Sequence, residues 1–125
     1  MRDQVQEAIS WTRKEQFEEA IGIMERAYGP EHPGLLQPLQ TYAAVLIAMW
    51  ELPAARRVQE RSIAMIESRF GAMDHRVAWM MNDYGNLLVR MGELENAIGR
   101  FERALTIVDA MEEPNRLLRV ATMVN

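Results

Sequence analysis

Apolar residues recur at helical spacing along most of the chain. One stripe in the third quarter of the sequence consists of Met81, Tyr84, Gly85 and Leu88. A second stripe follows it and consists of Leu94, Ala97, Ile98, Phe101, Ala104, Leu105 and Val108. Intervals of three and four residues predict amphipathic helices that turn these positions toward a core. Gly92 lies between the two stripes and suits the left-handed residue that ends many helices, so the pattern predicts a helical hairpin.

The same pattern occurs in three registered copies. When the sequence is aligned with itself so that Tyr42–Met65 falls on Tyr84–Ile107, these pairs are identical: Tyr42/Tyr84, Leu46/Leu88, Met49/Met91, Glu51/Glu93, Leu52/Leu94, Ala55/Ala97, Glu60/Glu102 and Arg61/Arg103. A second alignment places Phe17–Tyr28 on Leu94–Leu105 with seven of twelve residues identical. The first alignment shifts the chain by 42 residues, and repeats with a period of this size are typical of stacked helical hairpins.

The periodicity predicts an all-α protein with seven helices. We expect them near residues 3–14, 17–28, 35–49, 52–70, 75–91, 94–111 and 115–124. The connecting loops contain Gly29 and Gly71, Asp74 is a candidate N-cap, and Pro114 is expected to separate the last two helices. Small residues such as Ala43 and Gly85 recur in the first helices, where they would let two helices approach closely.

These repeats resemble the tetratricopeptide repeat (TPR) family over about residues 4–125. The 42-residue spacing, the Gly29–Pro33 loop and the run Met81–Leu88 are most similar to its kinesin-light-chain-like subgroup. The resemblance implies a right-handed α-α superhelix, in one domain 1–125 with units about 1–33, 34–75 and 76–113 and a partial fourth unit 114–125. Two departures are Gln59, which stands where other copies have a large apolar residue, and a 35-residue first unit that is shorter than the other spacing.

Composition narrows the function more than it defines it. The chain has 125 residues, 49% of them hydrophobic, which is enough for a core, and its net charge of −4 gives no field that would attract nucleic acid. Its 13 Arg against one Lys would suit phosphate recognition, but a coding preference explains the bias as well. The longest apolar run, Tyr42–Trp50, is far shorter than the roughly 20 residues of a membrane span, so we expect a cytoplasmic protein with no membrane partner.

Residues that could carry catalysis or bind a cofactor are scarce. Cysteine is absent, and the sequence lacks phosphate-binding, dinucleotide-binding and metalloprotease motifs. His32 and His75 are the only histidines, and their positions in the predicted inter-repeat loops favour a structural role over metal binding or catalysis. We therefore expect no enzyme activity, no cofactor and no metal.

The expected function is protein–protein interaction, because the first helices of stacked hairpins line a concave groove. On the third unit the groove residues would be Trp79, Asn82, Asn86, Val89 and Arg90. The matching residues are Gln37, Gln40, Ala44, Ile47 and Ala48 in the second unit, and Arg2, Val5, Ile9, Thr12 and Arg13 in the first. Asn82 and Asn86, one turn apart, could bond a peptide backbone, although ordinary solvated polar residues would give the same pattern. Trp79 favours binding, since exposed Trp is a frequent anchor.

The C-terminal segment suggests self-assembly as the alternative function. After Pro114 the chain has an apolar set of Leu117, Leu118, Val120, Ala121, Met123 and Val124. A helical array normally ends in a helix with a polar outer face, and this segment is the opposite. We therefore expect it to be covered, either by the rest of a longer protein or by a second chain in a homodimer.

Overall fold

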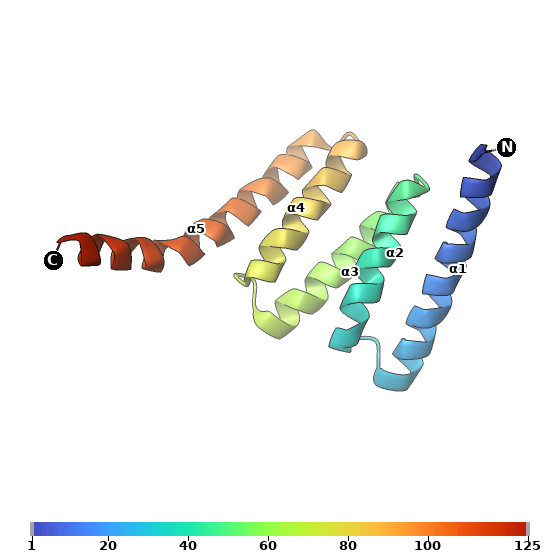
Figure 1. Ribbon diagram of the computed structural model, residues 1–125, viewed down its shortest axis with the longest axis horizontal. Helices are drawn as coiled ribbons and strands as arrows, with labels where there is room; N and C mark the ends of the chain where they lie inside the picture. The colour runs from blue at the N-terminus through green and yellow to red at the C-terminus, as the bar shows by residue number, and fades with distance from the viewer. Residues whose placement is uncertain (1, 125) are drawn as a thin grey trace. The chain divides into compact units, whose positions relative to one another are not determined.

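All regular structure in the described part of the chain is helical. The computed structural model describes the backbone of residues 2–124 and the side chains of residues 12–111. Five α-helices and one 3-10 helix follow in the order α1 (Arg2–Tyr28), η1 (Pro33–Leu35), α2 (Leu36–Ala48), α3 (Leu52–Phe70), α4 (His75–Arg90) and α5 (Leu94–Val124) (Figure 1). The predicted all-α class is confirmed.

The helices form two compact units, and the boundary between them lies within α3. The first unit is Met1–Met65 and the second is Ile66–Asn125. In the first unit, Ile21 on α1 packs with Leu35 and Leu39, and all three side chains are buried. The Tyr42 hydroxyl donates a hydrogen bond of 2.8 Å to Glu18 Oε1, which joins α2 to α1 at the edge of this core.

In the second unit, α4 and α5 pack against each other as a hairpin. The two helices approach closely at Gly85, because a Cβ atom built on it would lie 2.6 Å from Cε1 of Phe101. The small residue predicted at this position is therefore required by the ring of Phe101. The Arg100 guanidinium lies 5.4 Å from the centre of the Tyr84 ring, a cation–π contact between the same two helices.

The turns between paired helices repeat in the register of the sequence, down to single hydrogen bonds. The amide of Glu51 donates to the carbonyl of Leu46 at 2.9 Å, and the amide of Glu93 donates to that of Leu88 at 2.9 Å. The left-handed residue is Trp50 (φ 60°) in the first turn and Gly92 (φ 81°) in the second. The predicted left-handed role of Gly92 is confirmed.

The loops that follow α1 and α3 repeat in the same register. Each contains a left-handed glycine, Gly29 (φ 94°) or Gly71 (φ 93°). Three residues after that glycine, a side chain caps the next helix: His32 Nδ1 accepts from the amide of Gly34 at 3.0 Å, and Asp74 Oδ1 accepts from the amide of Arg76 at 2.9 Å. The predicted N-cap Asp74 is confirmed, and the structural counterpart of His32 is Asp74 rather than His75.

An ion pair also recurs at the same interval. Arg61 Nη1 lies 3.2 Å from Glu25 Oε1 in the first unit, and Arg103 Nη2 lies 2.7 Å from Glu67 Oε1 in the second. Loops and ion pairs therefore match the end of α1 to the end of α3 at an interval of 42 residues, the interval that also relates Tyr42 to Tyr84. In this register Ile21 on α1 matches Leu105 on α5, two intervals later.

Two of the expected helix breaks are absent. Residues 3–14 and 17–28 were expected to form a hairpin, but α1 is continuous across them, because Lys14, Glu15 and Gln16 all favour helix. Residues 94–111 and 115–124 were also expected to be separate helices, but α5 runs through Pro114. Proline in a helix interior removes one backbone hydrogen bond without necessarily ending the helix.

Candidate functional site

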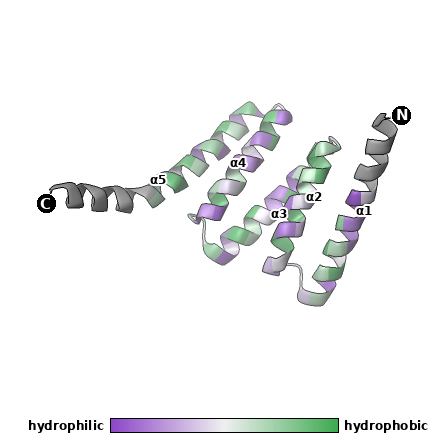
Figure 2. Cartoon of the chain, in the orientation of Figure 1, coloured by the Kyte–Doolittle hydropathy of each residue, from purple (hydrophilic) through white to green (hydrophobic). Residues whose placement is uncertain are grey.

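The largest group of exposed apolar side chains in the second unit lies on α4 and α5. Trp79 on α4 is 75% exposed, and the exposed apolar residues of α5 are Leu94, Ile98, Leu105, Val108 and Met111. Figure 2 shows hydrophobic positions in green along the part of α5 that pairs with α4. A group of exposed apolar side chains on one pair of helices marks a candidate interaction site.

A pocket of about 520 Å³ opens between the two helices. Its lining comprises Ala78, Trp79 and Asn82 from α4 and Phe101, Ala104, Leu105 and Val108 from α5. We refer to these seven residues as the α4–α5 face. Asn82 gives this mostly apolar lining one amide that can both donate and accept hydrogen bonds, the usual composition of a site that binds a partly apolar partner.

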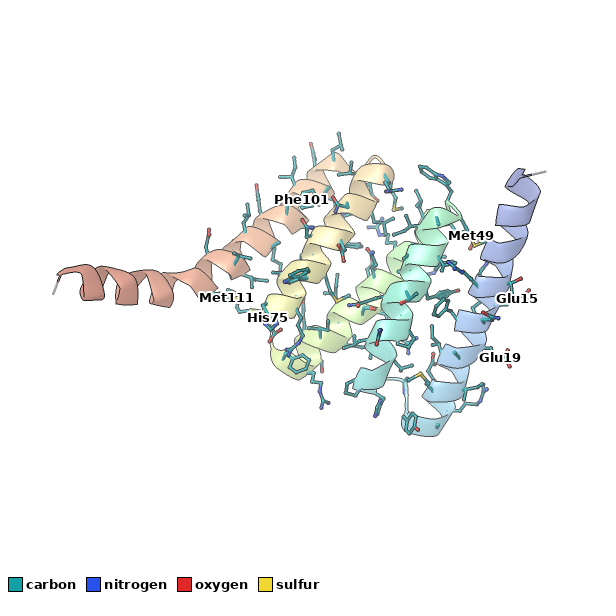
Figure 3. The ribbon with its side chains drawn as sticks, in the orientation of Figure 1. Glu15, Glu19, Met49, His75, Phe101 and Met111 are labelled. Atoms are coloured by element: carbon teal, nitrogen blue, oxygen red, sulfur yellow. The ribbon has the colours of Figure 1, made fainter. Side chains whose placement is uncertain are left out.

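The shape of the α4–α5 face depends on the missing side chain at Gly85. The nearest atoms to a Cβ at that position are Cε1, Cζ and Cδ1 of Phe101, all within 3 Å. The ring therefore occupies the space above Gly85 and forms part of the pocket lining. Figure 3 labels Phe101 on the half of α5 that pairs with α4 and Met111 farther along the same helix.

The α5 side of this face corrects an expectation about the core. The second apolar stripe was expected to be buried, but Leu105 is 62% and Val108 is 40% exposed, whereas Ala97 is buried. The reason is that α4 covers one side of α5, and the stripe is wider than the strip that one helix can cover. The sequence pattern contained these residues, but burial also depends on which neighbours are present.

The predicted groove residues of α4 are all exposed, but only some of them line the pocket. Trp79 and Asn82 are part of it, while Asn86, Val89 and Arg90 continue the exposed side of α4 beyond it. In the first unit, Gln37, Gln40 and Ala44 on α2 are exposed and Ile47 is half-buried. On α1, Thr12 and Arg13 are exposed, and the side chains of Val5 and Ile9 lie outside the described residues, as do those of the C-terminal apolar set.

One carboxyl group on the exposed side of α4 has a perturbed pKa. Asp83 follows Asn82 and lies one turn after Trp79, and partial burial raises the pKa of its carboxyl above the ordinary value. Asp74 at the start of α4 shows the opposite shift, because the backbone amide and the guanidinium of Arg76 stabilise its charged form and lower its pKa. Neither carboxyl belongs to a set of ligands, since no group of three potential metal-binding residues occurs among the described side chains.

Neither a search for membrane spans nor comparison with known proteins assigns a function to this site. Among the described residues, no helix combines the length and the apolar character needed to cross a bilayer. Comparison of the sequence with protein-family models gave no match, and a search of curated proteins gave none either.

Proposed function

We propose that this chain is a non-catalytic protein–protein interaction module that binds a segment of another protein on the exposed side of α4 and on the α4–α5 face. The observation that carries the proposal is the placement of Trp79, three-quarters exposed, at an apolar pocket that also contains the amide of Asn82. Tryptophan is over-represented among residues that dominate binding energy, because it offers a large rigid surface with one polar group.

The proposed architecture behind this function is a stack of TPR-like hairpins. It is supported by the registered recurrence of turns, capped loops and ion pairs within the two units. Asn86 and Arg90 would hold the polar backbone and an acidic group of the bound segment, while the pocket would take an apolar side chain.

Capture of partners from the native source, with matched variants, tests this proposal. Trp79→Ala combined with Asn82→Ala should weaken a genuine partner by about 2 kcal/mol or more, roughly thirtyfold. Trp50→Gly is the control, because Trp50 is 67% exposed but lies in the turn between α2 and α3, where its left-handed backbone suits glycine. A partner retained by the control and lost by the double variant supports the site.

Asn82→Ala with Asn86→Ala tests the polar contribution separately. We expect about 1 kcal/mol per lost hydrogen bond, with little change in melting temperature because both side chains are exposed. If partners bind these variants as tightly as the wild type while substitutions on another surface abolish binding, the proposed site is wrong.

A self-assembling module is the second candidate function. It is favoured by the uninterrupted course of α5, which continues well beyond the end of α4 (Figure 1). In that case the partner would be another copy of this chain rather than a foreign protein.

A further inference from the structure

The α4–α5 face lacks the helix that covers the matching positions of the first unit. Ile21 on α1 is only 6% exposed, because it packs against Leu35 and Leu39 at the start of the next helical segment. Leu105 occupies the matching position on α5 and is 62% exposed. The α4–α5 face therefore has the apolar positions of a helix-binding surface without the helix.

The chain does not fold back to cover this surface, for a local reason. The described backbone reverses direction at four left-handed residues, Gly29, Trp50, Gly71 and Gly92. Glu113 stands where the repeat register after Gly71 would place the next loop glycine, and the capping position of Asp74 is matched by Arg116. Without the glycine and the capping side chain, α5 continues as a helix instead of forming a third capped loop.

The continuation of α5 extends beyond its own partner helix. α5 has 31 residues and α4 has 16, which at about 1.5 Å per residue makes α5 longer by roughly 20 Å. Figure 1 shows the red end of α5 running on past α4. In this conformation residues 115–124 cannot reach the α4–α5 face of their own chain.

The sequence of this extension is that of a helix that binds an apolar surface. Four apolar residues occur at intervals of three, one and three, namely Leu117, Val120, Ala121 and Val124, a sequence spacing typical of an amphipathic helix. Arg116 and Arg119 interrupt the apolar residues and give the segment a positive charge. Asp83 supplies an acidic side chain on the exposed side of α4, close in sequence to Trp79 and Asn82.

We propose that residues 115–124 of one chain dock on the α4–α5 face of a second copy, and that the second copy returns the same contact. This proposal rests on the proposed function because it uses the same binding surface, the α4–α5 face. It adds that the segment bound there is residues 115–124 of a second copy of the chain. A reciprocal exchange gives a closed dimer with two-fold symmetry, in which both copies of the face and both extensions are covered. The docked helix takes the place that the segment after Gly29 takes against α1 in the first unit.

Light scattering coupled to size exclusion tests the dimer with the full chain. The wild type should have twice the chain mass of 14.4 kDa at tens of micromolar. Leu105→Asp changes the receiving face and Leu117→Asp changes the docking segment, so each alone should give a monomer. Ile23→Asp is the control, because Ile23 is an exposed aliphatic residue on α1 that belongs neither to the α4–α5 face nor to the docking segment, and this variant should remain a dimer. Circular dichroism should show unchanged helicity for all three variants.

Mixing the two monomeric variants distinguishes this arrangement from other dimers. Leu117→Asp retains an intact face and Leu105→Asp retains an intact docking segment, so an equimolar mixture should form a heterodimer through one remaining contact. Contact between two C-terminal segments, or between two faces, would not be restored by mixing. A wild-type monomer, a dimer that survives Leu105→Asp, or a mixture that stays monomeric overturns the proposal.

Glu113→Gly provides a further test, because it places glycine where Gly29 and Gly71 stand in the other two loops. We expect it to favour folding of residues 115–124 onto their own chain and therefore to shift the dimer toward monomer at a given concentration. An unchanged dimer affinity would contradict the argument from the missing glycine. The dimer and a foreign partner use the same face, but the two proposals fail with different results. A monomeric wild type whose partner binding depends on Trp79 overturns the dimer and leaves the proposed function intact. A wild-type dimer whose foreign partner binds equally well after Trp79→Ala supports the dimer and overturns the proposed function.

Discussion

Gly85→Ala is the most direct test of how closely α4 and α5 approach. The added Cβ would lie 2.6, 2.8 and 2.9 Å from three ring atoms of Phe101, roughly 1 Å closer than ordinary carbon–carbon contact. Overpacking of this kind costs about 1–3 kcal/mol. Replacement of glycine by alanine inside a helix returns about 1 kcal/mol of helix propensity. We therefore expect a net loss of about 1 kcal/mol in the free energy of unfolding.

Gly99→Ala is a matched control on the partner helix. A Cβ at Gly99 would meet nothing within 4 Å, so only the gain in helix propensity remains and this variant should be more stable by about 1 kcal/mol. Urea denaturation of both variants measures the difference, which should be about 2 kcal/mol. Phe101→Leu removes the outer ring atoms and should relieve the cost of Gly85→Ala in a double-mutant cycle. Equal stabilisation by both alanines would refute the close approach of the two helices.

The remaining predictions concern polar groups. Asp83→Asn should raise the melting temperature at neutral pH, because the raised pKa of this carboxyl means that its charged form lowers the stability of the fold. In the wild type, the protonated carboxyl contributes to stability at low pH, and this contribution is lost as pH rises through the raised pKa. Asp74→Asn should lower the melting temperature at neutral pH. The lowered pKa of Asp74 means that its charged form contributes to the stability of the fold, and this contribution is lost as pH falls below the ordinary carboxyl pKa. Burial and the hydrogen bond to Glu18 raise the pKa of Tyr42 to about 12, so its contribution should be lost between about pH 10 and 12, and Glu18→Gln should move its absorbance titration part of the way back. The Gln59 side-chain oxygen is buried and accepts no hydrogen bond from the described residues. Gln59→Met should therefore stabilise the fold by about 1 kcal/mol in urea denaturation, and a loss of stability would contradict that geometry.

Helix ends with a local chemical signal were predictable from sequence. Residues 52–70 were expected as a helix and are α3, and the last helix before Gly92 was expected to end at residue 91 and ends at Arg90. In both cases a left-handed residue follows, and its hydrogen bonds close the helix. The side chain of Asp74 is short and placed three residues after Gly71, which is sufficient to start α4.

Features that depend on neighbours were not predictable in the same way. The break expected near Lys14 came from matching Phe17–Tyr28 to a later hairpin, but nothing in the local sequence stops α1 there. The stripe on α5 was assigned to the core from its apolar spacing alone. Apolar spacing indicates a buried side only where another element covers it, and several residues of this stripe are exposed. Trp79 and Asn82 were identified as candidates from their spacing, whereas the pocket they share with Leu105 required the pairing of α4 with α5.

The loops at Gly29 and Gly71 recur 42 residues apart, so the segment between them can be treated as one repeat unit that could be duplicated. Gly29 and Gly71 have nearly the same φ, and each is followed by a cap three residues later. A segment cut after Gly29 and after Gly71 therefore begins and ends with matching backbone geometry, and Arg61 and Glu67 within it provide one half of each neighbouring ion pair. Insertion of a second copy of residues 30–71 would recreate every loop hydrogen bond at the new junction. The number of hairpins could thus change by duplication of this one repeat unit, without any new junction chemistry.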